Sequence, residues 1–286
     1  MKESFWQRLC RGARHWQCRQ DWPHFAGADW PERIMGVAVT DRFHAKQGRS
    51  TGRWILQTGD RQLAVYLKRH YRLPWWRGLL AAAWPKGGWS PAVQEWRHLE
   101  WARGQGMPVP AAVAAGEYIG PWGRLQSFLA VEELAGMMPL HEAVPAARDC
   151  LRPEAFARWK RGLAMELARL CRDLHERRYF HKDLYLCHFY VPAEFTRQLP
   201  AWRDRVHMID LHRLGHHPWT WRIWQIKDLG QLAYSSEVEG VHARDRLRFW
   251  RGYLGPAYRG WAARVLSWCI RSKWLRYRRH NKKRNH

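Results

Sequence analysis

The sequence has few acidic residues, no long apolar run and no paired cysteines. Its 286 residues include 25 Asp and Glu against 49 Lys and Arg, which gives a formal net charge of +24. The best apolar run, Leu79–Trp84, is far shorter than the roughly 20 residues that a membrane-spanning helix needs. The first residues lack the apolar stretch of a secretory signal. The six cysteines show no Cys-x-x-Cys pair and no metal spacing, so we expect a reduced, cytoplasmic setting.

Basic residues and tryptophan are abundant. Hydrophobic residues make up 46% of the chain, which excludes a disordered basic protein, and 21 residues are Trp. The charge predicts an anionic partner, such as nucleic acid, anionic lipid or a phosphorylated substrate, or only a solvated surface. No nucleic-acid-binding motif is visible, so we expect no nucleic acid. A basic, Trp-rich chain without a membrane span is typical of a protein that works on a membrane surface.

Strand patterns fill the first half of the chain and helical patterns fill the second. The expected strands are Phe43–Gln47, Arg53–Thr58, Gln62–Lys68, Ala111–Tyr118, Leu125–Glu132 and Val206–Leu211. The expected helices are Pro91–Gly104, a long one from Pro153, Lys227–Val238 and Ala243–Tyr253. We therefore predict an α+β, two-lobed fold, with lobes over 31–136 and 137–270. Residues 1–30 form a basic aromatic lead-in without predicted structure, and 271–286 form a basic tail.

Residues Trp75–Trp89 resemble an insertion into the first lobe, with an apolar patch between aromatic residues. One interpretation is that these aromatic side chains are exposed and contact a membrane. The alternative is a hydrophobic cover over the lobe itself.

Two features of the first lobe suit phosphate binding. Gly48 and Gly52 flank a short loop between strands, where backbone N–H groups can approach phosphate oxygens. Two glycines in a hairpin are more often only a turn. Lys68 ends a strand, and a lysine that faces phosphates needs a carboxylate to hold it. Glu95 on the following helix is the candidate, although the two residues could also be unrelated surface charges.

Two features of the second lobe suit phosphoryl transfer. The segment His181–His188 follows the long helix and is similar to the protein-kinase catalytic loop His-Arg-Asp-x-x-x-x-Asn, with Asp183 at the position of the base. Lys182 replaces Arg, and His188 stands where kinases have the Asn that binds magnesium. Asp210 follows on a short strand, where kinases place a magnesium-binding Asp, but Asp-Leu-His replaces Asp-Phe-Gly.

Over roughly residues 45–255, the sequence resembles the lipopolysaccharide core heptose kinases and the related Kdo kinases of Gram-negative bacteria. The matching segments are Tyr66–His70, Glu95-Trp96, His181–Phe189 with its Tyr-x-Cys-His-Phe ending, Ile209–Arg213, Lys227–Leu229, Tyr234–Ser236 and Arg244–Phe249. The resemblance implies a protein-kinase-like fold and an ATP- and Mg²⁺-dependent enzyme. It implies that the acceptor is a sugar hydroxyl, on a heptose attached to lipid A at the cytoplasmic face of the inner membrane.

The resemblance also implies roles for individual residues. Asp183 would be the catalytic base, and Lys68 would hold the nucleotide phosphates. Asp210 would bind magnesium, whereas His188 would bind it or orient Asp183; orientation suits His188 better because magnesium prefers oxygen ligands. Two further pairs complete the site: His181 and Asp228 would support the catalytic loop, and the backbone of Glu132 and Glu133 would meet adenine.

The acceptor and the partners stay open at this point. The same fold could act on Kdo, another glycan or a protein tyrosine, and a non-enzymatic nucleic-acid-binding protein is the remote alternative from charge alone. The charge suits the polyanionic lipopolysaccharide inner core and a peripheral contact with an anionic membrane. A small acidic protein is a further partner that a basic surface would accept.

Overall fold

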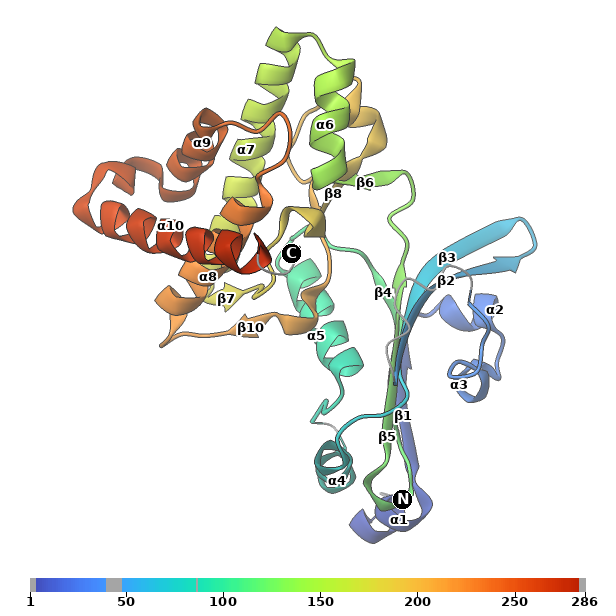
Figure 1. Ribbon diagram of the computed structural model, residues 1–286. Helices are drawn as coiled ribbons and strands as arrows, with labels where there is room; N and C mark the ends of the chain where they lie inside the picture. The colour runs from blue at the N-terminus through green and yellow to red at the C-terminus, as the bar shows by residue number, and fades with distance from the viewer. Residues whose placement is uncertain (1–3, 40–47, 86, 283–286) are drawn as a thin grey trace. The chain divides into compact units, whose positions relative to one another are not determined.

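The chain forms two compact units in the computed structural model, which describes residues 4–39, 48–85 and 87–282 (Figure 1). Unit 1 comprises Met1–Gln105 and Pro110–Leu134, and unit 2 comprises Gly106–Val109 and Ala135–His286. Unit 1 contains an antiparallel sheet, and unit 2 is mainly helical. The predicted α+β class is therefore confirmed.

Unit 1 is a five-stranded antiparallel sheet with helices on both faces. Its strands are β1 (Ala13–Cys18), β2 (Arg49–Thr58), β3 (Arg61–His70), β4 (Ala112–Ile119) and β5 (Leu125–Glu132), in the order β1-β4-β5-β3-β2. Its helices are α1 (Phe5–Arg11), α2 (Trp22–Ala26), α3 (Trp30–Arg33), α4 (Trp75–Ala83), α5 (Pro91–Gly104) and the 3₁₀ turn η1 (Pro121–Gly123). The predicted hairpin is the β2–β3 pair, whose turn contains Gly59 with φ +56°.

The predicted lead-in is an integral part of unit 1. Strand β1 pairs with β4 at the sheet edge, and α2 and α3 place Trp22 and Trp30 against the sheet, 0% and 2% exposed. Two fully buried indoles contribute several kcal/mol of burial free energy, at roughly 25 cal/mol per Å². The sequence pattern missed this segment because its buried Trp residues alternate with Arg, His and Asp.

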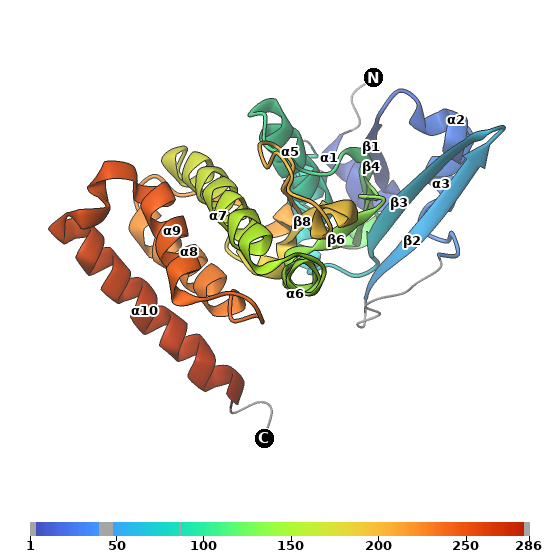
Figure 2. The ribbon, with the colours of Figure 1, turned by 90° about the horizontal axis from the view of Figure 1, so that it is seen from above.

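Helix α5 covers the opposite face of the sheet from α2 and α3 (Figure 2). Ser90 caps its N-terminus by accepting a hydrogen bond from the Val93 N–H, and Pro91 occupies the first turn, where its missing N–H costs nothing. These signals explain why the helix runs over Pro91–Gly104, as predicted. Because side chains alternate along a strand, Lys68 of β3 lies on the face opposite Leu67 and Arg69.

Unit 2 is built mainly from helices, with five short strands in two small sheets among them. Its helices are α6 (Leu140–Cys150), α7 (Pro153–Glu176), α8 (Trp221–Ser235), α9 (Ala243–Leu254) and α10 (Trp261–Lys282). The strands are β6 (Met137–Pro139), β7 (Tyr179–Phe180), β8 (Phe189–Pro192), β9 (His207–Met208) and β10 (Gly215–His216). The 3₁₀ turns are η2 (Leu186–His188), η3 (Ala193–Thr196), η4 (Leu211–Arg213) and η5 (Gly255–Arg259).

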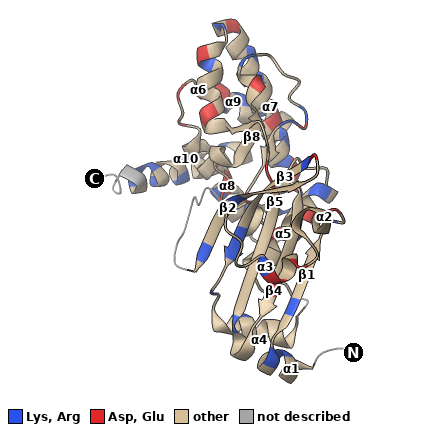
Figure 3. Cartoon of the chain, turned by 90° about the vertical axis from the view of Figure 1, so that its right-hand side faces the viewer, with Lys and Arg blue, Asp and Glu red and all other residues tan. Residues whose placement is uncertain are grey.

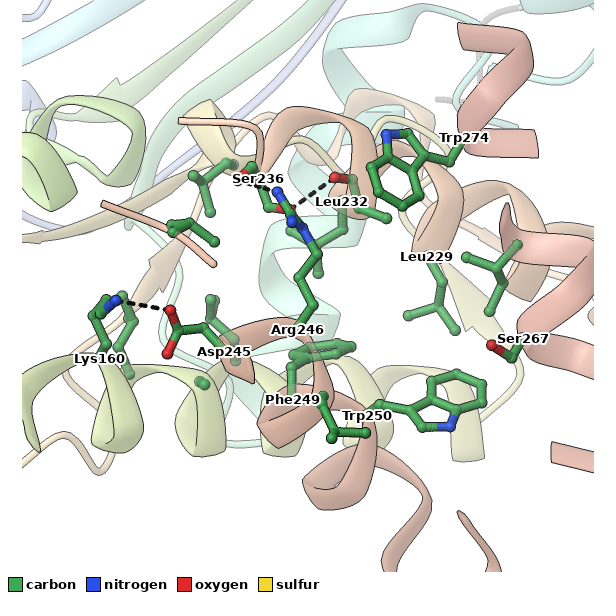
Figure 4. A pocket seen from close by; sticks show the side chains of 18 of the residues that line it. Lys160, Leu229, Leu232, Ser236, Asp245, Arg246, Phe249, Trp250, Ser267 and Trp274 are labelled. Carbon is green, nitrogen blue, oxygen red and sulfur yellow. Dashed lines mark hydrogen bonds and ion pairs between the residues drawn. The ribbon is translucent and has the colours of Figure 1, made fainter. Parts of the chain in front are cut away.

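Helix α7 organises unit 2. It buries the residues that its sequence periodicity predicts, and it packs on α9. The buried residues are Phe156, Trp159, Leu163, Leu167, Leu170 and Leu174. The predicted tail helps to form α10, which packs on α8. An apolar cavity of about 320 Å³ lies among α7, α8, α9 and α10 (Figure 4).

Some predicted elements differ from the structure. The strand expected over Val206–Leu211 is only His207–Met208, because Asp210 takes a left-handed backbone conformation with φ +63°. The strand expected over Phe43–Gln47 lies outside the described residues. Among the helices that the structure describes, none is both long and apolar enough to cross a bilayer.

Candidate active site

Lys68 and Glu95 form an ion pair inside unit 1. The Lys68 Nζ lies 2.7 Å from Glu95 Oε1, and the side chains are 17% and 5% exposed. Strand β3 presents the lysine to α5, and the capped start of α5 places Glu95 in its first turns. A lysine held in this way keeps its charge in a fixed position, which suits the neutralisation of phosphate oxygens.

The expected glycine loop has a different structure. Residues from Arg49 onward belong to β2, and Gly52 is paired with Leu67 inside the β2–β3 ladder. Gly48 precedes the strand in a left-handed conformation, φ +83°, which glycine adopts without steric cost. The loop expected over 48–52 is therefore wrong for 49–52, because β3 offers these residues a ladder partner. Gly48 alone keeps a turn conformation.

Glu132 and Glu133 lie at the end of β5 with their carboxylates in ion pairs. Arg19 Nη1 donates to Glu132 Oε2 at 2.7 Å, and Arg53 binds Glu133 through two hydrogen bonds of 2.8 Å. Their backbone N–H groups donate to the carbonyls of Ala111 and Ala64. A contact with adenine through the backbone of these two glutamates would therefore use their carbonyl oxygens.

In unit 2, Asp228 of α8 holds the backbone of the candidate catalytic loop. Its carboxylate is fully buried and accepts the N–H groups of His181 and Lys182, each at 2.8 Å. His175 of α7 lies 3.4 Å away through Nε2. A buried carboxylate needs such donors, because an unpaired buried charge is costly. Asp228 therefore fixes the residue before Asp183, where Lys182 has φ +67°.

Two further side chains of α8 continue this support, and neither was predicted from the sequence. Gln231 Oε1 accepts the Leu184 N–H at 3.2 Å, and Ser235 Oγ accepts the Leu186 N–H at 2.8 Å. Asp228, Gln231 and Ser235 are spaced by three and four residues, so they share one face of the helix. That spacing of polar residues beside a catalytic motif is the signal that could have identified them.

The Asp183 carboxylate is oriented by two donors. Arg213 Nη1 lies 3.0 and 3.2 Å from its two oxygens, and Gln231 Nε2 lies 3.4 Å from Oδ1. The side chain of Asp183 is 20% exposed, so it remains partly accessible. Arg213 stands three residues after Asp210, and η4 brings it back to Asp183. The role of Arg213 is not evident from the sequence alone.

His188 links Asp183 to Asp210. Its Nδ1 lies 2.7 Å from the Asp183 carbonyl oxygen and must donate, because a carbonyl only accepts. Its Nε2 lies 3.9 Å from Asp210 Oδ2. The other Asp210 oxygen, Oδ1, accepts from His212 Nδ1 at 2.9 Å. Burial lowers the pKa of His188, but Cys187 and the hydrogen bond to the Asp183 carbonyl outweigh it, so the net shift is upward.

Asp210 and His188 form a group that fits a magnesium ion. Mg²⁺ is commonly held by one or two carboxylates together with substrate phosphates. Asp210 supplies an oriented carboxylate, and the Nδ1 hydrogen bond of His188 serves orientation, while its Nε2 is the atom that would reach a metal. The described residues contain no cluster of three or more His, Cys, Asp and Glu that could hold a metal by itself. A magnesium site here would therefore need phosphate ligands.

His181 is a buried structural residue beside this group. It has no exposed surface, and its Nε2 donates to the Ile209 carbonyl at 3.0 Å, next to Asp210. Burial lowers its pKa, which favours the neutral ring. The neutral tautomer with the proton on Nε2 matches this hydrogen bond. Through it, the catalytic loop is tied to the segment that carries Asp210.

The structure thus brings Lys68 to Glu95 within unit 1, and Asp183, His188 and Asp210 to one another within unit 2. An antiparallel β unit with a Lys–Glu pair and a helical unit with this loop define a kinase-like phosphotransferase. The family model described as lipopolysaccharide kinase (Kdo/WaaP) family matches residues 40–253. The chain belongs to this family.

Individual relatives agree with this assignment. The lipopolysaccharide core heptose(I) kinase WaaP of Pseudomonas aeruginosa is 33% identical over 206 residues, which cover 71% of this chain and 74% of the relative. The protein of the same name from Escherichia coli is 31% identical over 196 residues, 65% of this chain and 71% of the relative. The solved structure of WaaP in complex with acyl carrier protein matches with a TM-score of 0.67 and 28% identity, and covers 91% of this chain and 98% of that one.

Proposed function

We propose that this protein transfers the γ-phosphoryl group of ATP to a hydroxyl of a heptose in the lipopolysaccharide inner core. The loop His181–His188, with Asp183 and Asp210 joined through His188, is the observation that carries the proposal. The choice of heptose rests on the relatives, whose names state that acceptor.

Within this proposal, each residue has a defined task. Asp183 accepts the proton of the attacking hydroxyl, and Arg213 and Gln231 hold its carboxylate in place. Lys68, fixed by Glu95, neutralises nucleotide phosphates. Mg²⁺, held by Asp210 and phosphate oxygens, would supply charge neutralisation at the transferred group.

The charge of the chain suits the acceptor and its location. An inner core that carries phosphates and carboxylates is polyanionic, and a net charge of +24 attracts it. The lipid anchor of such an acceptor would bring the enzyme to the cytoplasmic face of the inner membrane, where ATP is available. An acyl carrier protein, named as the partner of the related structure, would be the small acidic partner of this chain as well.

Incubation of the full chain with ATP, Mg²⁺ and defined core acceptors tests the activity. Mass spectrometry of the products would locate the phosphate on the heptose, and Asp183→Ala or Asp210→Ala should abolish the transfer while the fold is retained. For Asp183, loss of a general base alone corresponds to about 10²–10⁴ in rate. Asp149→Ala, which removes an exposed carboxylate of α6, is the matched control and should keep full activity. Transfer to Kdo or to protein tyrosine instead would replace the proposed acceptor.

A further inference from the structure

One end of unit 1 is built from α1, α4 and η1, which pack against one another (Figure 1). The Arg8 guanidinium of α1 donates to the Ala82 carbonyl of α4 at 2.6 Å. Gly78 of α4 faces the backbone of Gly123 so closely that a Cβ atom would collide with its carbonyl. The three elements therefore form one packed surface.

This surface exposes an unusual number of tryptophans. The five exposed indoles, here called the Trp end, are Trp6 (67% exposed), Trp75 (68%), Trp76 (47%), Trp84 (62%) and Trp122 (74%). Trp122 also has a left-handed backbone, φ +57°, which is a rare and costly conformation for a bulky residue. Large indoles on the surface of a monomer mark an interaction site when they gather in one region.

The segments that build this end of unit 1 carry basic residues and no acidic ones. The segments that build it, residues 4–20, 71–94 and 118–131, contain no Asp or Glu. A hollow next to α1 and η1 is lined by four exposed arginines, here called the arginine hollow: Arg11, Arg14, Arg72 and Arg124. Glu32 approaches Arg14 at 3.6 Å, whereas the other three have no acidic partner among the described residues. Figure 3 shows Lys and Arg in blue on α1 and α4.

We propose that the Trp end is the surface through which the protein docks on an anionic phospholipid bilayer. The indoles would enter the interface between headgroups and acyl chains, which is where Trp is favoured, and the arginine hollow would accept lipid phosphates. The proposal rests on the proposed function insofar as that function requires a lipid-anchored acceptor. It refines the predicted membrane contact, because Trp6 and Trp122 join the Trp75–Trp89 segment in one surface.

A bilayer fits this surface better than a protein partner does. The indoles come from three elements at one end of a sheet, and the segments that contribute them carry basic residues but no Asp or Glu. Tryptophan with Arg is the combination that peripheral helices use on anionic lipid. An acidic protein would also be attracted by the arginines, so its binding is measured as a competing outcome.

Vesicle cosedimentation of the full chain tests the proposal. Vesicles of phosphatidylethanolamine and phosphatidylglycerol should bind the wild type, and vesicles of phosphatidylcholine alone should bind it less. Trp75→Ala with Trp76→Ala should lower the partition coefficient by roughly tenfold or more, because two indoles no longer leave water. Arg72→Gln with Arg124→Gln should lower it by about fivefold per arginine, with a reduced salt dependence.

Two control variants test whether vesicle binding depends on this surface or on any exposed Trp or any exposed Arg. Trp219→Ala removes an indole of unit 2 that is 93% exposed, and Arg158→Gln with Arg161→Gln removes two exposed charges of α7. Both should bind vesicles as the wild type does. If the Trp75/Trp76 variant fails to fold, Trp122→Gly carries the test, because glycine tolerates the backbone conformation at that position.

Phosphate transfer to a delipidated, water-soluble core acceptor distinguishes the two proposals. The Trp75/Trp76 variant should keep this activity. If the wild type itself does not phosphorylate the soluble acceptor, the proposed function is refuted, but the vesicle-binding result still stands. The docking proposal is overturned if the Trp and Arg variants bind vesicles like the wild type. It is equally overturned if they lose only the binding of acyl carrier protein while vesicle binding persists.

Discussion

Within the described residues, a largely buried lysine–carboxylate pair lies in each unit, and the two pairs differ in what surrounds them. Lys68 and Glu95 lie 2.7 Å apart in unit 1, with exposures of 17% and 5%. Lys160 and Asp245 lie 2.8 Å apart in unit 2, between α7 and α9, with exposures of 9% and 8% (Figure 4). By distance and chemistry alone, the two pairs are nearly the same.

The pair in unit 2 is enclosed by local partners. Lys160 also donates to the Gly240 carbonyl at 2.6 Å and lies 4.7 Å from the centre of the Phe156 ring. Asp245 also accepts from Arg248 at 2.7 Å and caps α9 through the His242 N–H at 3.0 Å. These contacts join the start of α9 to α7. The geometry is that of a structural clamp.

The pair in unit 1 stands in a different setting. Lys68 is about twice as exposed as Lys160 and lies two residues before the end of β3, on the face of the sheet that meets α5. A lysine that must meet phosphate oxygens needs such access, whereas a clamp does not. Under the proposed function, the same kind of ion pair serves nucleotide binding where the lysine remains accessible, and folding where it does not. Variants of the two pairs can break this distinction.

Removing Lys160 should produce the largest change, and only in stability. Lys160→Ala leaves Asp245 buried with a weaker set of donors, and breaking a buried pair costs about 3–5 kcal/mol of unfolding free energy. Denaturant unfolding of the full chain measures this loss. Asp245→Leu combined with Lys160→Met should recover part of it, since no buried charge is left without a partner. A stable but inactive Lys160→Ala variant would contradict the structural role.

Removing Lys68 should lower activity strongly and stability only slightly. Lys68→Ala is expected to lower kcat/KM for ATP by roughly 10²–10³, the cost of losing one preorganised charge at a phosphate. Its unfolding free energy should change less than that of Lys160→Ala, because Lys68 is more exposed. Steady-state kinetics and denaturant unfolding on the same samples provide the comparison.

Glu95→Gln sharpens this second test. The amide keeps the shape of the side chain but loses the charge that fixes Lys68, so activity should fall by less than in Lys68→Ala. Lys68→Arg serves as a charge control, and full activity in Lys68→Ala would end the assignment of this pair to nucleotide binding.

These pairs also show which contacts could be predicted from the sequence and which could not. The Lys68–Glu95 pair was expected because a strand lysine and a helix glutamate follow each other in kinase order. The Lys160–Asp245 pair joins residues 85 positions apart. Asp245 lies in the family-matching segment Arg244–Phe249, but Lys160 lies in no such segment, so only the packing of α7 on α9 reveals the pair. In the same way, Asp228 followed from the family resemblance, whereas Arg213 and Gln231 depend on how η4 and α8 turn toward Asp183.

The fold shows the same limit. Helices with caps and a clear apolar period, such as Pro91–Gly104 and the helix from Pro153, could be predicted from local signals. Residues 5–34 could not, because the burial of Trp22 and Trp30 depends on a sheet face formed far along the chain. The loop predicted around Gly52 was wrong for a related reason: a glycine that suits a phosphate loop also fits a paired strand.

We expect the stabilisation by the Lys160–Asp245 pair to depend on pH, because Asp245 titrates in acid. Burial raises the pKa of this carboxyl, but the hydrogen bonds from Lys160 and the His242 N–H outweigh it, so the pKa lies below its ordinary value of 3.8. The unfolded chain therefore takes up the proton at a higher pH than the folded chain. The stabilisation is fully present above the unfolded pKa and is lost as the pH falls through the folded one.

Denaturant unfolding of the wild type and Asp245→Asn as a function of pH measures this effect. The difference between their unfolding free energies should be constant near neutral pH and shrink below pH 3.8, with a slope of at most about 1.4 kcal/mol per pH unit for one proton. Asp149 is an exposed carboxylate of α6, and for Asp149→Asn the difference in unfolding free energy should depend much less on pH. A constant difference for Asp245→Asn down to the acid transition would show that the ionised pair does not clamp α9 to α7. In that case, the folded and unfolded chains would bind the same number of protons at residue 245. The two lysine pairs would then differ only in their positions in the fold.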